Sequence, residues 1–132
     1  MALQRRLKVL QPGTEDKWMD TAVKVAFAST DMKQVNQHFG AAEAFALYAI
    51  DMERVELIEV VQFGALEMDG NEDKLGAKIN ALEGCIAVYS QAVGASAVGQ
   101  LKQRGIQAVK VTPGASVSDL LESLQEQLRE GP

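Results

Sequence analysis

The chain has 132 residues, of which 47% are apolar and 23% charged, with a net charge of −5 and a pI near 4.9. This size and composition suit one domain with its own core, and the acidic balance argues against nucleic acid as the main partner, because that affinity depends on neutralising phosphates. One cysteine excludes an internal disulfide, and no apolar run approaches the roughly 20 residues that a membrane span needs, so we expect a soluble, cytoplasmic protein.

Residues 1–20 mix charges with Pro12 and Gly13 and show no sustained period, so we interpret them as a flexible lead-in. A single domain is then expected over residues 21–132. Its apolar runs predict five strands, at residues 22–29, 44–50, 55–63, 85–90 and 107–112. The first and fourth can be buried on both faces, as in the centre of a sheet, whereas Glu56 and Glu59 make the third suit an edge.

In three segments the apolar residues recur with a helical period, at residues 69–84, 94–105 and 116–130, and these segments predict helices. The expected inward positions are Leu75, Ile79 and Leu82 in the first helix, Val98 and Leu101 in the second, and Val117, Leu120, Leu121, Leu124 and Leu128 in the third. Gly84 and Gly105 can end the first two helices. Capping-box spacing occurs at Asp69 and Glu72, and again at Ser116 and Asp119.

The predicted order is β-β-β-α-β-α-β-α. Three strands that can pair antiparallel come first, and αβ units with right-handed crossovers follow. A mixed five-stranded sheet with helices on both faces satisfies this order. We therefore expect an α/β fold of the ribonuclease-H-like kind.

A site is expected where the strands at 23–29 and 85–90 end, if these strands are parallel neighbours. Ligands of open α/β sheets favour the crevice outside such strand ends. The loops that leave them are residues 30–40 and 91–97. The second loop opens a helix with Gly94, Ala95 and Ser96, whose unpaired N–H groups and partial positive charge suit an anion.

His38, the only histidine, follows the first strand in the stretch "NQHFG". A neutral imidazole is a good ligand for iron and similar metals. The alternative is that His38 caps a turn or bonds a backbone carbonyl. Cys85 begins the fourth strand, at the end opposite the crevice, where a buried thiol acts as a small hydrophobe.

Enzymatic readings find little support in the sequence. A ribonuclease-H-type nuclease needs several carboxylates to hold two magnesium ions, and only Asp31 follows the first strand closely. The chain contains no G-x-S-x-G, P-loop or G-x-G-x-x-G motif. Cys85 and His38 would lie at opposite strand ends, so they cannot act as a nucleophile and its base. We expect a protein that is not an enzyme.

Three stretches together resemble the dinitrogenase iron–molybdenum cofactor biosynthesis family: "VKVAFASTDMKQVNQHFG", "FALYAID" and "EDKLGAKINALEGCIAVYSQAVGASAVGQLKQRGIQAVKV". The resemblance covers residues 22–130 and is strongest to members of the NifX type. It implies a ribonuclease-H-like fold without nuclease activity. It also implies transient binding of an iron–sulfur precursor of the iron–molybdenum cofactor, taken from a NifB-like donor and passed to a NifEN-like scaffold acceptor.

The resemblance assigns His38 as a metal ligand, with Cys85 a weaker candidate. Further cluster contacts would come from the Lys33 charge, from side chains that donate hydrogen bonds and from the backbone at the helix start: Ser29, Asn36, Gln91, Gly94, Ala95 and Ser96. Some relatives carry cysteines where this chain has Ser90 and Ala41-Ala42, so it offers few thiolates. Few exchangeable bonds suit a carrier. The alternative is a chaperone that docks on cofactor-free nitrogenase or on the assembly scaffold.

Overall fold

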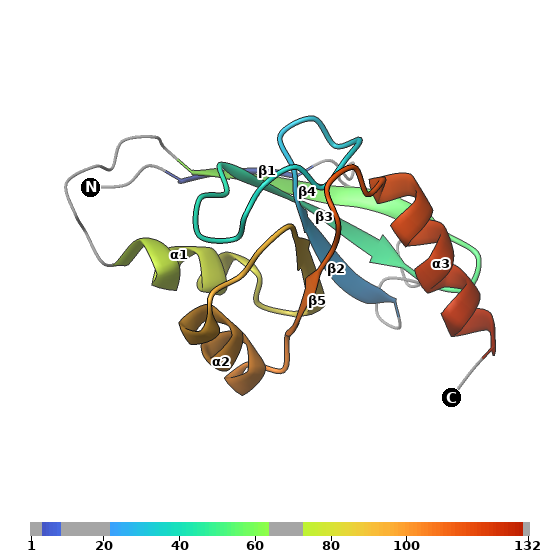
Figure 1. The fold of residues 1–132 in the computed structure, drawn as a ribbon. Helices are drawn as coiled ribbons and strands as arrows, with labels where there is room; N and C mark the ends of the chain where they lie inside the picture. Colours follow the sequence, from blue (N-terminus) through green and yellow to red (C-terminus); the bar gives the residue numbers. More distant parts are fainter. Residues whose placement is uncertain (1–3, 9–21, 64–72, 131–132) are drawn as a thin grey trace.

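The computed structural model describes residues 4–8, 22–63 and 73–130 (Figure 1). Its elements, in chain order, are β1 (Gln4–Lys8), β2 (Val23–Ala28), β3 (Ala44–Ile50), β4 (Val55–Phe63), α1 (Asp73–Ala81), β5 (Cys85–Ser90), α2 (Ala95–Gln103), β6 (Gln107–Lys110) and α3 (Val117–Glu130). The five predicted strands and three predicted helices are all present. The predicted start of the first helix, including Asp69 and Glu72, lies outside the described residues.

The strands form one mixed sheet in the order β1-β4-β3-β2-β5-β6. β2 pairs antiparallel with β3 and parallel with β5, and β6 pairs parallel with β5. Both β2 and β5 are interior strands with a neighbour on each side, which agrees with the prediction that both their faces are buried. Four of the six residues of β2 and five of the six of β5 are buried, because helices cover both faces of the sheet.

The sheet corrects two expectations, because it has a sixth strand. Residues 4–8, assigned to the lead-in by sequence, form β1 and pair with β4 from Gln4↔Phe63 to Lys8↔Glu59. An edge strand is held by backbone bonds and needs no apolar alternation, so its charged sequence gave no strand signal. As a result β4 lies between β1 and β3 instead of at an edge, and Glu59 is buried there.

The two faces of the sheet carry separate cores, and Figure 1 shows α1 and α2 on one face and α3 on the other. The predicted apolar positions of α1 and α3 pack into these cores. In α2 the expectation for Val98 was wrong: its side chain is 38% exposed, and Ala97 is buried beside Leu101. Residues 97 and 101 are four apart and share a helix face, whereas residue 98 lies about 100° further round.

The predicted helix ends are confirmed in their geometry. Gly84 and Gly105 take the left-handed conformation, with φ of +92° and +78°. At the start of α3 the Ser116 hydroxyl accepts a hydrogen bond from the Asp119 amide at 3.2 Å. No helix among the described residues has the length and apolar content that crossing a membrane requires.

Candidate functional site

Two loops meet where β2 and β5 end. The strands are parallel neighbours, with Phe27 in register with Tyr89, so their carboxyl ends lie at the same edge of the sheet. The β2–β3 connection (residues 29–43) and the β5–α2 connection (residues 91–94) leave from there. This is the crevice position expected from the strand order.

Backbone hydrogen bonds join these loops around His38. The Gln91 amide donates to the Gln37 carbonyl at 2.9 Å, and the Phe39 amide donates to the Ala92 carbonyl at 2.8 Å. His38 therefore lies between two residues that are both bonded to the β5–α2 loop, and α2 begins three residues after Ala92. The structure thus brings the histidine close to the helix start, as expected.

The His38 side chain points away from the core. Its neighbour Phe39 is fully buried and packs against Phe45, with ring centroids 5.4 Å apart, whereas His38 is exposed. Within the described residues the imidazole has no hydrogen-bond partner, although the His38 carbonyl accepts from Ala41 at 3.2 Å. The alternative role, in which the side chain caps a turn or bonds a carbonyl, is therefore not what the structure shows. The imidazole is accessible as a ligand.

The first turn of α2 is open to an anion. Gly94 is its N-cap, with φ −75° and ψ 161°, and no side chain caps the helix. Ala95 and Ser96 are exposed, and no acidic residue lies in the first turn. The N–H groups there keep their partial positive charge.

Three of the expected hydrogen-bond donors are already engaged in holding the loops. The Ser29 hydroxyl is buried, donates to Asp31 at 3.2 Å and accepts from the Met32 amide at 2.8 Å. The Asn36 side chain pairs with Thr30 through bonds of 2.9 and 3.1 Å, and the side-chain amide of Gln91 donates to the Val35 carbonyl at 3.0 Å. These side chains hold the loops. The Ser29 hydroxyl reaches a ligand only by giving up a bond, whereas the side-chain amides of Asn36 and Gln91 each have a second N–H.

Lys33 and Asp31 differ in what they offer at this edge. The Lys33 side chain is exposed, while its backbone carbonyl accepts from the Val117 amide at 2.9 Å. The Asp31 carboxylate accepts from the amides of Lys33 and Gln34 at 2.8 and 3.1 Å. These two bonds lower its pKa below the ordinary value. Asp31 is therefore a loop cap, and Lys33 is the available charge.

Cys85 is buried at the far end of β5, in register with Lys24 at the start of β2. Ser90 is five residue steps further along the strand, roughly 16 Å at 3.3 Å per residue. It is therefore too distant to share a ligand with His38, as the sequence predicted. In the described ranges no three His, Cys, Asp or Glu side chains come together as a metal site.

Sequence reasoning missed Lys78, which fixes the turn after His38. Lys78 is buried, with 6% of the residue exposed. Its ammonium donates to the Gly40 carbonyl at 2.6 Å and lies 5.7 Å from the centre of the Phe63 ring. The available signal was its position in α1, three residues after the inward-facing Leu75. A lysine at such a position needs a partner, because burying an unpaired ammonium is costly.

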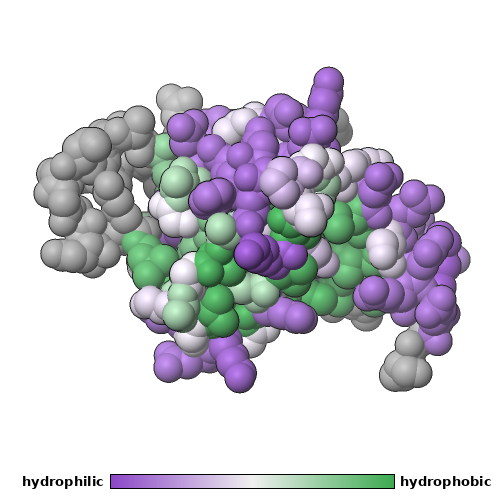
Figure 2. Space-filling view, viewed as in Figure 1, coloured by the Kyte–Doolittle hydropathy of each residue, from purple (hydrophilic) through white to green (hydrophobic). Residues whose placement is uncertain are grey.

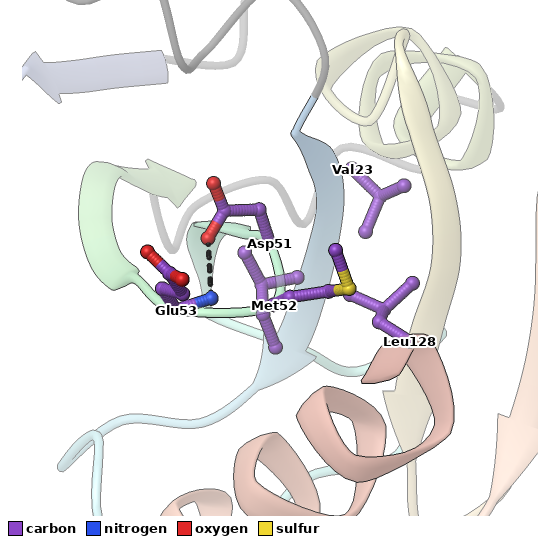
Figure 3. Close-up of a pocket in the computed structure, with 6 residues that line it drawn as sticks. Val23, Asp51, Met52, Glu53 and Leu128 are labelled. Atoms are coloured by element: carbon purple, nitrogen blue, oxygen red, sulfur yellow. Dashed lines mark hydrogen bonds between the residues drawn. The ribbon is translucent and has the colours of Figure 1, made fainter. Parts of the chain in front are cut away.

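Open pockets also occur among the described residues, and Met32 of the β2–β3 connection lines one of about 500 Å³. Figure 3 shows one of about 420 Å³ near the start of β2, where the side chains of Val23, Met52 and Leu128 converge. Its carboxylate Asp51 accepts from the Glu53 amide at 2.8 Å and so caps the hairpin. His38 does not line this pocket, nor two others of about 500 and 330 Å³. The histidine instead lies on open surface, where a bulky partner has access.

The chain matches a family of known proteins and is similar in sequence to several named members. Residues 21–127 match the family described as dinitrogenase iron-molybdenum cofactor. The chain is 54% identical to protein NifX of Azotobacter vinelandii, over 97% of this chain and 78% of that one. It is 37% identical to protein NifX of Klebsiella pneumoniae, over 83% and 68%.

Solved structures agree on the fold. The crystal structure of PH0822 superimposes with a TM-score of 0.61 at 26% identity, covering 80% of this chain and 90% of that one. A Thermotoga protein solved by NMR gives 0.56 at 24% identity, with the same coverage, and at this identity it bears on the fold alone.

Proposed function

The chain belongs to the dinitrogenase iron-molybdenum cofactor family and is NifX-like, and from this premise we propose that it is a non-catalytic carrier of an iron–sulfur precursor of the nitrogenase cofactor. The observation that carries the proposal is the exposed His38 imidazole. It has no hydrogen-bond partner among the described residues and is held beside an uncapped helix start. Because the family takes part in nitrogenase cofactor biosynthesis, we infer that the bound molecule is a precursor of that cofactor.

The donor set fits a cargo that is held briefly. An iron–sulfur cluster kept as a prosthetic group takes four cysteine thiolates, whereas here one imidazole is available and the chain's single thiol is buried at the far strand end. His38 would supply one exchangeable bond to iron. The backbone N–H groups of Ala95 and Ser96 would hold anionic sulfides by hydrogen bonds, and Lys33 would offset part of the charge.

In this proposal Ser29, Asn36 and Gln91 act by fixing the loops, and Gly94 lets the cluster approach the helix start closely. The protein receives its cargo in the cytoplasm from a NifB-like donor and gives it to a NifEN-like scaffold acceptor. The strand order β4-β3-β2-β5-β6 supports the ribonuclease-H-like description of the scaffold. Such a role needs no catalytic group, which agrees with the use of Asp31 as a loop cap.

An anaerobic titration with the isolated iron–sulfur product of NifB tests the proposal, followed by charge-transfer absorbance. We expect saturable binding near one cluster per chain. His38→Ala should weaken it at least tenfold, about 1.4 kcal/mol, since one metal–ligand bond is lost. Lys102→Ala, which removes a charge from the exposed far end of α2, is the control and should leave the affinity unchanged.

Each outcome has a distinct meaning. Equal binding by the wild type and His38→Ala would remove the histidine from the ligand set. Absence of binding by both would overturn the carrier. It would favour the alternative, a chaperone that docks on cofactor-free nitrogenase or on the assembly scaffold.

A further inference from the structure

Charge is unevenly distributed along this acidic chain. From Gly84 to Ser118 the sequence has three basic residues, Lys102, Arg104 and Lys110, and no acidic one. The remaining 10 basic and 18 acidic residues therefore carry the whole net negative charge. All three basic side chains are exposed, and none forms an ion pair with a described residue. They lie on α2, at its C-cap and on β6, which places them along one margin of the sheet.

That margin is an edge strand with open backbone groups. β6 is the last strand of the sheet, with β5 on one side and no described strand on the other. The amide of Val111, the residue after β6, donates to the Ser90 carbonyl of β5 at 2.9 Å. Because amide directions alternate along a strand, the N–H groups of Ala108 and Lys110 point away from β5. They are available to another strand.

Apolar surface flanks this edge on both sides. A groove of about 330 Å³ runs between α2 and β6, lined by Val98, Ile106 and Ala108, with Lys102 at its margin. On the α3 face Val109 and Val111 are only half-buried. Figure 2 shows hydrophobic residues gathered between α2 and α3, in contrast to the hydrophilic outer face of α3. A strand added here would bury apolar side chains on either face.

We propose that the outer edge of β6 is a docking site for an acidic, extended segment of a partner protein, which adds to the sheet as a further strand. Main-chain bonds to Ala108 and Lys110 supply register, and alternate apolar side chains fill the groove beside Val98. The three basic residues select acidic segments and speed their approach. Edge lysines also discourage pairing with neutral strands, so the same charges that protect the edge make it specific.

The inference is independent of the cluster, and a short peptide tests it. The probe is a fluorescein-labelled octapeptide of alternating Val and Glu, and an alternating Val and Gln octapeptide is its neutral counterpart. Fluorescence anisotropy at low salt should show saturable binding of the acidic peptide only. The affinity should fall as salt is added, because the exposed charges are screened.

Protein variants separate the two parts of the site. Lys110→Glu should weaken binding of the acidic peptide at least fivefold, whereas Lys33→Glu, the same change on an exposed lysine of the β2–β3 connection, should alter it less than twofold. Ala108→Pro removes an outward N–H group and should therefore abolish binding. The variant should still fold, since an edge position tolerates proline. If this variant does not fold, hydrogen exchange of the Ala108 and Lys110 amides in the wild type replaces it, and saturating peptide should slow both.

Failure of the acidic peptide to bind would overturn the proposal. If the neutral peptide bound as tightly as the acidic one, the proposed selection by charge would be wrong. If folded Ala108→Pro still bound the acidic peptide, strand addition would be refuted. Self-association that Ala108→Pro abolishes, without peptide binding, would instead identify the occupant as a second copy of the chain.

Discussion

The two halves of the β2–β3 connection are held mainly by different kinds of hydrogen bond. In residues 29–36 side chains satisfy the backbone: Ser29, Asp31 and Asn36 bond to amides of their own loop. In residues 37–43 distant parts of the chain do so, through the β5–α2 loop and the Lys78 ammonium. The first half therefore caps much of its own backbone, although Lys33 and Val35 are also bonded to the segment before α3, and the second half depends mainly on distant contacts.

This difference identifies which polar residues are available for binding. Short polar side chains in a loop often bond to nearby backbone, as Ser29 and Asn36 do here, and are then poor ligand candidates. His38 is spared because other elements satisfy its neighbours' backbone. The same sequence stretch therefore contains structural polar residues and one that is open to a ligand.

The largest effect should come from removing the anchor of the second half. Lys78→Met eliminates a charge-assisted bond and should lower the free energy of unfolding by about 1.5–3 kcal/mol. The turn after His38 then loses its support, so cluster affinity should fall as well. Urea unfolding and the cluster titration measure the two effects. Lys102→Met, the same substitution at an exposed position, should change stability by less than about 0.5 kcal/mol.

Ser29→Ala should affect only the first half of the β2–β3 connection, and it should lower stability less than Lys78→Met does. It leaves the Met32 amide without its acceptor, so stability should fall by about 1–2 kcal/mol while cluster affinity is unchanged. His38→Ala should give the reverse pattern, with affinity lost and stability kept. If both variants changed affinity equally, the division between structural and ligand-binding residues would be wrong.

The smallest effect concerns Asp31 and pH. Amide donors from Lys33 and Gln34 hold its folded-state pKa below the ordinary 3.8, so its contribution to stability is present above pH 3.8 and is lost as pH falls through the folded pKa. NMR titration of the Asp31 carboxyl carbon should give a midpoint below 3.8. Asp31→Asn should remove this part of the acid dependence of unfolding. A midpoint at or above 3.8 would show that the cap does not form in solution.

Much of the fold and part of the site were predictable from local pattern. The strand and helix periods, the glycines that end α1 and α2 and the parallel pairing of β2 with β5 are all present. β1 was missed because edge pairing leaves no apolar period. Val98 was misjudged because a small residue, Ala97, takes the inward position in α2.

The sequence by itself determined the order of elements and the meeting of two loops beside a lone histidine, since these follow from hydrophobic period and strand direction. Only the tertiary structure decided which polar groups are engaged. Lys78 meets Gly40 across 38 residues, and Gln91 meets Val35 across 56. Local sequence cannot specify such pairs, because their geometry exists only once the sheet has assembled.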